Sequence, residues 1–387
     1  MANKTDKTQT TAGAPLRILL MGDASNYNNC LAAGLRRLGH DVVVASDGSH
    51  WLDTERDIDL SRRLPGKIGG LMLWLKIKSL LNRKLSGYDI VSVYGTCFVT
   101  LRPNRLHQIF DYLLANNHRV HVCVMSADTH YVNTCLGNNP PIRYSEWHIN
   151  GVPSDYARAC EADIMRWNAP ELSGLCNDIY KQSAGAVTAL YEYNEICRSI
   201  IPDEKLAYGG IPIDTTEIGY IGTNPSGRKV RIFLGRHAER TLEKGTDKLQ
   251  VAAQRVVAAH GDICELDIVE NLPYSDYLKR LQEADIVLDQ LYSYTPATNA
   301  LLAMAMGKTV VSGGEPEYYE FIGEYDNRPI INAVPDDDEA LFRSIENAVM
   351  HPGVLTDMSS KNRDFVIKHN DVMVVAQRYL DFWKKSL

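Results

Sequence analysis

The stretch that decides the fold runs from residue 230 to residue 270 and reads "VRIFLGRHAERTLEKGTDKLQVAAQRVVAAHGDICELDIVE". An apolar run ends at Gly235, residues 246–260 repeat apolar side chains at helical spacing, and "ICELDIVE" follows as a further apolar run. A strand, a helix and a strand in this order predict an α/β unit built on a parallel sheet. The series continues through "YSDYLKRLQEA", "DIVLDQL", "ATNALLAMAMG" and "KTVVSG" to residue 313.

The first half of the chain carries a second series of the same kind. "LRILLMG" at 16–22, a helical pattern at 28–40 and "DVVVAS" at 41–46 predict a βαβ unit. "YDIVSVYG" at 88–95 and "RVHVCVMS" at 119–126 predict further strands, and residues 177–201 predict one later helix. The predicted fold class is α/β, with two Rossmann-like domains facing a central crevice.

Composition shifts divide the chain into segments. We expect a disordered tail at 1–14, a first domain at 15–208, a second domain at 209–370, and a final helix at 371–387 that can cross back to the first domain. The segment 209–229 is punctuated by Gly, Pro and Ser, which favours a domain boundary and hinge.

Composition, net charge and cysteine spacing disfavour some classes of function. The 387 residues are 45% hydrophobic with a net charge of -7, so nonspecific nucleic-acid binding is not favoured and an anionic ligand needs a local cluster of donors. The eight dispersed cysteines form no C-x-x-C pair, which predicts reduced thiols of a cytoplasmic protein, with disulfides or zinc as the alternative. No apolar run approaches the length of a membrane span.

A basic amphipathic pattern occupies residues 71–84. It mixes Leu, Met, Trp and Ile with lysines and an arginine. Such a helix either packs on the core with solvated lysines or makes a peripheral contact with an anionic membrane, here on its inner face.

The strand ending at Gly235 is followed by groups suited to phosphate. Gly235 permits close approach by a ligand, Arg236 offers a planar fork of donors, and Lys244, followed by Gly245, offers a compact ammonium. The alternative is that both cations are solvated loop charges. The pattern resembles the diphosphate clamp of retaining GT-B glycosyltransferases of family 4, in which these two cations stabilise the leaving nucleoside diphosphate.

The segment "TPATNALLAMAMGKTVV", which begins at Thr295, predicts a helix capped by Thr295 and a following strand. It is similar to the family's E-x7-E region in its Ala-Met-Ala and Gly-Lys elements. The two glutamates of that motif, which contact sugar and ribose, fall at Tyr294 and Leu302, so the motif is degenerate here. Tyr294, Thr298 and Asn299 are the candidate replacement contacts. For Thr298 and Asn299 the alternative is that they serve only as first-turn residues of the helix.

The same resemblance implies binding or catalytic roles for residues in two further loops. Leu272 and Tyr274 lie in the region similar to the base-binding loop, where Tyr274 either stacks on the base or packs. In the first domain, Asp128 and His130 follow an apolar strand, at a position similar to the family's catalytic-loop histidine. A hydrogen-bonded structural histidine is the alternative.

The resemblance implies a metal-independent, cofactor-free enzyme. It would move a hexosyl or related sugar from a nucleotide-diphosphate donor to a glycan or lipid-linked acceptor on the first domain, with retention of configuration. Two alternatives stay open: a catalytically inactive GT-B protein that binds nucleotide or glycan, and a sugar-nucleotide epimerase.

Overall fold

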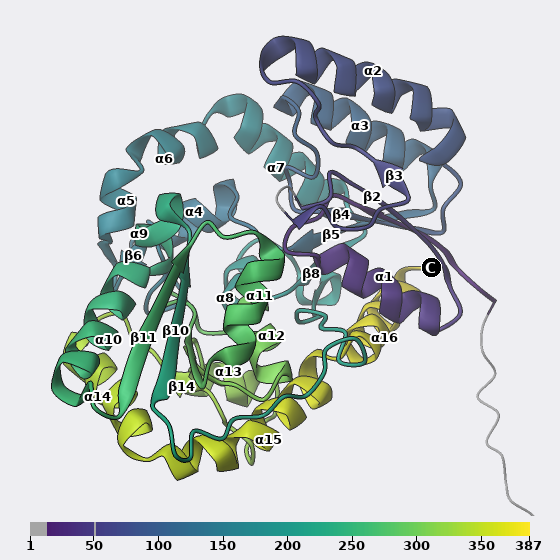
Figure 1. The fold of residues 1–387 in the computed structure, drawn as a ribbon. Helices are drawn as coiled ribbons and strands as arrows, with labels where there is room; N and C mark the ends of the chain where they lie inside the picture. The colour runs from purple at the N-terminus through teal and green to yellow at the C-terminus, as the bar shows by residue number, and fades with distance from the viewer. Residues whose placement is uncertain (1–13, 50–51) are drawn as a thin grey trace, which may run out of the picture.

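The computed structural model describes residues 14–49 and 52–387, and the expected tail lies outside this part of the chain except for Ala14. Two parallel sheets, each flanked by helices, form two Rossmann-like domains (Figure 1). The predicted fold class is therefore confirmed.

The first sheet, within the described residues, has seven strands in the order β3-β2-β1-β4-β5-β8-β9. The strands are β1 (Arg17–Met21), β2 (Asp41–Ser46), β3 (Ile58–Asp59), β4 (Ile90–Tyr94), β5 (Arg119–Val124), β8 (Gly185–Thr188) and β9 (Leu206–Tyr208). β4 is buried along its whole length because helices cover both faces of the sheet, as the continuous apolar runs predicted.

Helices connect these strands. They are α1 (Tyr27–Arg37), α2 (Gly66–Lys84), α3 (Pro103–Asn116), α4 (Thr129–Cys135), α5 (Asp155–Ala159), α6 (Glu161–Trp167), α7 (Pro170–Gln182) and α8 (Tyr191–Cys197). The prediction of one helix over 177–201 was wrong, because β8 separates α7 from α8. Four residues of small and β-branched type are too few for periodicity to distinguish a buried strand from a helix.

The second sheet has the order β11-β10-β12-β13-β14 in the described residues. Its strands are β10 (Val230–Arg236), β11 (Cys264–Glu270), β12 (Ile286–Leu288), β13 (Thr309–Ser312) and β14 (Ile331–Asn332). Its helices are α9 (Thr241–Lys244), α10 (Thr246–His260), α11 (Tyr274–Glu283), α12 (Thr298–Ala305), α13 (Pro316–Phe321), α14 (Asp338–Met350) and α15 (Pro352–Asn370). Chain connections leave β10 and β12 toward opposite sides, so the switch point of this sheet lies between them.

Several contacts join the domains. The last helix, α16 (Val372–Trp383), packs against α1 in the first domain, and the Tyr379 and Tyr27 hydroxyls share a hydrogen bond of 2.7 Å. A small hairpin, β6 (His148–Ile149) and β7 (Val152–Pro153), precedes α5, which contacts α9 of the second domain. Among the helices described, none is long and apolar enough to cross a membrane.

Candidate functional site

The loops that follow β10 and β12 meet at the switch point of the second sheet. The backbone N–H of Leu291 donates to the carbonyl oxygen of Lys244 at 2.9 Å. Gly245 has a φ of 65°, and a Cβ there would lie 2.7 Å from the Cβ of Leu291, so only glycine fits this junction. The junction places Lys244 directly before the N-terminus of α10.

Lys244 is a half-buried cation without a carboxylate partner in the described part of the chain. Its neighbour on α9, Glu243, is instead held by Arg240 through a bidentate pair, with Nε to Oε2 at 2.8 Å. A cation at the positive end of a helix and next to a switch point is suited to an anionic ligand.

Arg236 ends β10, but its guanidinium is engaged by protein groups. Its Nε lies 2.8 Å from Oε2 of Glu270, and it also donates to the side-chain oxygen of Gln250. The in-register pairing of Arg236 with Glu270 on β11 brings the two together. Its predicted role in binding diphosphate stays a prediction, and it requires the guanidinium to change partner.

Gly235 is explained by packing against α11. A Cβ at this position would lie 2.4 Å from Cε2 of Tyr277, so the tyrosine ring fills the space that a ligand was predicted to approach. Tyr277 in turn donates from its hydroxyl to the side-chain oxygen of Asn299 at 2.6 Å.

The start of α12 differs from the predicted cap. The helix begins at Thr298, and its N-cap residue, Ala297, provides no side-chain cap. Thr295 does not cap it, because the Thr295 hydroxyl lies before the helix, where it donates to Oε2 of Glu192 at 2.8 Å and accepts from the backbone N–H of Tyr191 at 3.1 Å.

The two candidate contacts at the start of α12, Thr298 and Asn299, differ in whether their polar groups are already hydrogen-bonded. Asn299 uses both ends of its amide, because it also donates to Oδ1 of Asp289 at 3.1 Å. Thr298 is half-buried, and its hydroxyl has no hydrogen-bond partner within the described residues. Of the pair, Thr298 is the one open to a ligand. Leu302, where the resemblance places a ribose-binding glutamate, is partly buried against the core.

Tyr294, where the resemblance places the other glutamate, is buried and contacts the first domain. Its hydroxyl accepts from the backbone N–H of Arg143 at 2.6 Å, and its ring stacks on Tyr144 with centroids 4.7 Å apart. Burial raises the pKa of Tyr294. A role in gripping the sugar stays a prediction for this residue.

Leu272 and Tyr274 flank the start of α11 and are both partly exposed. Burial of part of its ring raises the pKa of Tyr274. Their accessibility is compatible with the predicted contact to a base.

The first-domain pair, Asp128 and His130, lies at the start of α4. Asp128 is buried and caps the helix by accepting from the N–H of Tyr131 at 2.9 Å, while its other oxygen accepts from the hydroxyl of Tyr180 at 2.6 Å. His130 packs edge-on against the Tyr180 ring at 5.5 Å. The structure therefore gives Asp128 a capping role, and a catalytic role for either residue stays a prediction.

Two glutamates of the first domain, the buried Glu192 and the half-buried Glu146, lie near groups of the second domain and were missed by sequence reasoning. Glu192 accepts from the hydroxyls of Ser293 at 3.0 Å and Thr295, and burial raises its pKa. Glu146 accepts from the Tyr131 hydroxyl at 2.9 Å, and burial, with Glu243 and Glu192 nearby, raises its pKa to about 7. Nothing in their local sequence distinguishes them, because their environment comes from the packing of the two domains.

A pocket of about 330 Å³ lies at the carboxyl ends of β1, β2, β4 and β5 in the first domain. Asp23 and Asp47 contribute carboxylates, and Tyr94, Phe98 and Trp167 contribute aromatic rings. Burial raises the pKa of Asp23. None of the described residues that line the pocket is Lys or Arg, so it suits an uncharged or cationic group better than a phosphate.

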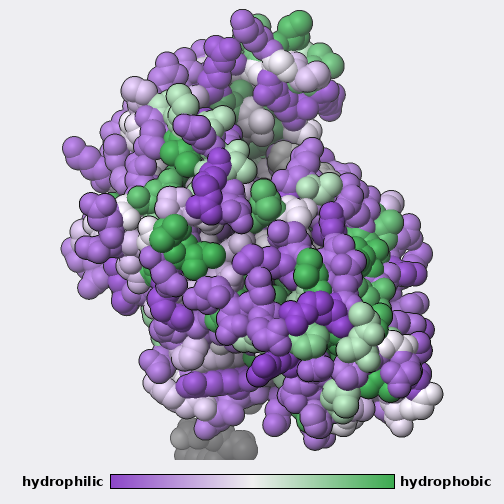
Figure 2. Space-filling model, turned by 90° about the vertical axis from the view of Figure 1, so that its left-hand side faces the viewer, coloured by the Kyte–Doolittle hydropathy of each residue, from purple (hydrophilic) through white to green (hydrophobic). Residues whose placement is uncertain are grey.

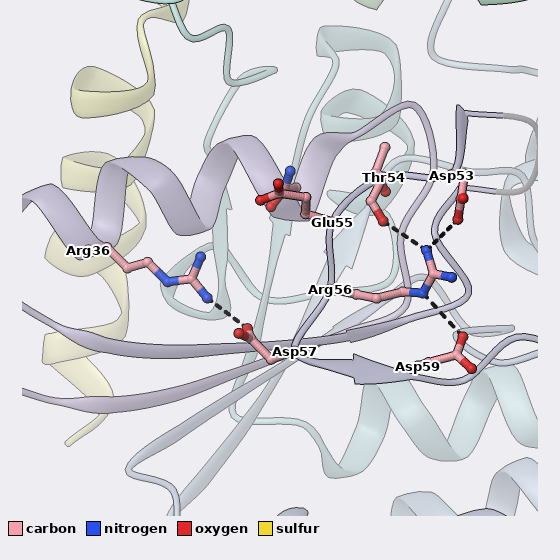
Figure 3. A pocket seen from close by; sticks show the side chains of 8 residues that line it. Arg36, Asp53, Thr54, Glu55, Arg56, Asp57 and Asp59 are labelled. Carbon is pink, nitrogen blue, oxygen red and sulfur yellow. Dashed lines mark hydrogen bonds and ion pairs between the residues drawn. The ribbon is translucent and has the colours of Figure 1, made fainter.

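A larger hollow of about 530 Å³ on the same domain is lined by residues that form ion pairs with one another (Figure 3). Arg36 pairs with Asp57 at 2.7 Å, and Arg56 pairs with Asp53 at 2.7 Å and with Asp59 at 3.1 Å. Both arginines are engaged by these ion pairs, and Glu55 adds a further carboxylate to the lining. The hollow lies between α1 and the loop before β3, apart from the switch point of the second sheet.

Comparison with solved structures identifies the class of fold. Sucrose-phosphate synthase from Thermosynechococcus elongatus superposes with a TM-score of 0.62 at 12% identity, over 95% of this chain and 98% of that one. The catalytic domain of Arabidopsis thaliana starch synthase IV, bound to ADP and acarbose, gives 0.60 at 11%, over 96% and 99%. Anabaena HepE, in complex with UDP and glucose, gives 0.57 at 12%, over 96% and 100%.

The chain has the GT-B fold, two Rossmann-like domains in the arrangement shared with these glycosyltransferase structures. At these identities the likeness shows the fold alone. No protein-family model and no curated protein matches the sequence.

Proposed function

We propose that this protein is a glycosyltransferase that moves a sugar from a nucleoside-diphosphate donor to a hydroxyl group of an acceptor bound by the first domain. The observation that carries the proposal is Lys244: a cation without a carboxylate partner in the described chain, next to the N-terminus of α10, at the switch point of the second sheet. Open α/β sheets bind their ligands at such switch points.

The proposed donor site consists of groups on the segments that follow β10, β11 and β12. The Lys244 ammonium and the Thr298 hydroxyl would bind phosphate oxygens, and Leu272 and Tyr274 would contact the base. In the departing diphosphate the negative charge grows as the bond to the sugar breaks, so a fixed ammonium stabilises the transition state more than the ground state. Arg236 would add to this stabilisation after leaving Glu270.

The proposed acceptor site is the first-domain pocket. Its aromatic rings and the carboxylates of Asp23 and Asp47 suit the apolar faces and hydroxyl groups of a sugar. Retention of configuration would follow if the acceptor hydroxyl attacks from the face that the diphosphate leaves, a scheme that needs no nucleophile from the protein.

The test measures binding of UDP, GDP and ADP by calorimetry to the wild type, to Lys244→Ala and to the control Lys361→Ala. Lys361 is an exposed lysine on α15, at the end of the second domain away from α9 (Figure 1). Loss of a charge-assisted contact of about 1.5–3 kcal/mol weakens binding about 10- to 100-fold in Lys244→Ala only. Absence of binding for all three nucleotides contradicts the proposal.

A second candidate is a GT-B protein that binds nucleotide without turnover. It is favoured by the pairing of Arg236 with Glu270 and by the absence of a carboxylate at Tyr294 and Leu302. Incubation with UDP-, GDP- and ADP-sugars separates the two candidates: release of nucleoside diphosphate supports transfer, whereas binding without release across a panel of glycan acceptors supports the second candidate.

A further inference from the structure

Helix α2 carries a stripe of exposed apolar side chains on the outer edge of the first domain. Ile68 and Leu75 are 68% and 56% exposed, and Leu71 and Met72 between them are about half exposed, at 47% and 50%. Leu64 extends the stripe into the preceding loop. On α2, a rotation of roughly 100° per residue places Ile68, Leu71, Met72 and Leu75 on one face, while Leu73, Trp74 and Ile77 of the same helix are buried against the domain.

α2 is the uppermost element of Figure 1. The top of Figure 2, which views the molecule from the left-hand side of Figure 1, shows a few hydrophobic side chains among hydrophilic ones. An exposed apolar patch rimmed by polar residues marks an interaction site in a protein of this size.

All the charged side chains of the segment that carries this stripe are cations. Residues 60–84 contain no Asp or Glu but hold seven cations, in a chain whose net charge is -7: Arg62, Arg63, Lys67, Lys76, Lys78, Arg83 and Lys84. Lys76 pairs with Asp59 at 3.0 Å, and Lys78 lies over the Trp74 ring at 5.0 Å. Within the described residues, Lys67 and Arg83 have no partner.

The cations border the stripe on both sides. With roughly 100° of rotation per residue, Lys67 and Lys78 fall along one edge of the apolar face and Lys76 and Arg83 along the other. An apolar face between two rows of cations is the arrangement of a helix that lies in the plane of a membrane interface, with its apolar side chains among the acyl chains and its cations at anionic head groups.

We propose that residues 62–84 dock the protein peripherally on an anionic lipid surface. A second copy of the chain is a poor occupant, because the stripe would bring the two sets of seven cations together. Anionic head groups complement that charge, and the apolar stripe gives the contact a component that salt does not screen. The proposal is independent of the proposed function, since it involves no group of the nucleotide site.

The test is flotation of the full-length protein with vesicles of phosphatidylcholine alone and of phosphatidylcholine mixed with phosphatidylglycerol. The variants are the double substitution Ile68→Ser with Leu75→Ser, and the double substitution Lys67→Glu with Arg83→Glu. The matched control is Val251→Ser with Val354→Ser, two apolar residues of the second domain with 58% and 49% exposure. All substituted side chains are exposed, and circular dichroism checks that each variant folds.

We expect the wild type and the control to bind the mixed vesicles, to bind pure phosphatidylcholine weakly, and to lose affinity as salt rises. Each variant of α2 should bind the mixed vesicles about tenfold less or worse. Equal binding by the wild type and the α2 variants overturns the proposal, as does the absence of binding to mixed vesicles. Light scattering provides the last arm: a dimer that the serine variant abolishes assigns the stripe to a second copy and also overturns it.

Discussion

The hydroxyl of Tyr294 accepts a hydrogen bond of 2.6 Å from the backbone N–H of Arg143, in the other domain. The guanidinium of Arg143 reaches back to Glu315 at 2.5 Å and to Glu317 at 3.0 Å. The backbone N–H and the side chain of Arg143 thereby both bind the segment before the β6–β7 hairpin to the second domain. Tyr294, where the resemblance places a sugar-binding glutamate, joins the two domains in this structure.

Tyr294→Phe should lower the free energy of unfolding by about 1–3 kcal/mol. The substitution removes the acceptor of the Arg143 N–H and leaves that group partly buried without a partner. Urea denaturation measures the change. Tyr325→Phe, in which the tyrosine is 68% exposed, is the matched control and should stay within about 0.5 kcal/mol of the wild type. Equal stability of the two variants would show that the interdomain bond contributes nothing.

Glu270→Gln should raise the affinity for nucleoside diphosphates several-fold. It weakens the ion pair that holds the Arg236 guanidinium and frees this cation for phosphate. Calorimetry with UDP, GDP and ADP measures the effect. The control is Glu265→Gln: Glu265 lies on the same strand as Glu270, β11, and its carboxylate is paired with Arg231 on β10. Unchanged affinity in Glu270→Gln would assign Arg236 to the structure of the sheet alone.

Glu192→Leu should destabilise the contact between the domains more than Glu192→Gln does. Leucine leaves the hydroxyls of Ser293 and Thr295 without their acceptor, whereas the glutamine oxygen still accepts from one of them. Each buried group left without a partner costs about 1–3 kcal/mol. Limited proteolysis and urea denaturation of both variants test the ranking, and a leucine variant as stable as the glutamine variant would contradict it.

Glu146 makes the stability depend on pH in a defined window. Its pKa is raised from the model-compound value of 4.5 to about 7, so between these values the folded state holds a proton that the unfolded state has lost. Stability therefore falls as pH rises through this window, by at most about 1.4 kcal/mol per pH unit, and the effect is absent below it and constant above it.

Glu146→Gln removes this dependence, because the amide does not ionise. The free energy of unfolding of the variant, relative to the wild type, should increase between the two pKa values, as measured by urea denaturation across that range. Parallel curves for the two proteins would show that Glu146 is not protonated in the fold.

Local patterns predicted most of the architecture and part of the site. Neighbouring residues alone produce the apolar runs of β1, β4 and β10 and the helical period of α10. These patterns can therefore be recognised in a single sequence. Lys244 was located because it lies between the strand pattern that ends at Gly235 and the helical pattern that begins at residue 246. The strand β8 was missed because four apolar residues between two helices carry no period of their own.

What the sequence by itself determined is the class of fold and the loops in which the candidate ligand-binding groups lie, because both follow from the order of buried strands and helices. Only the tertiary structure decided which of those groups are free. The register of β10 on β11 pairs Arg236 with Glu270, and the docking of the two domains pairs Thr295 with Glu192 and Tyr294 with Arg143. Each of these partners lies at least 34 residues away along the chain, so the choice depends on packing that no local pattern encodes.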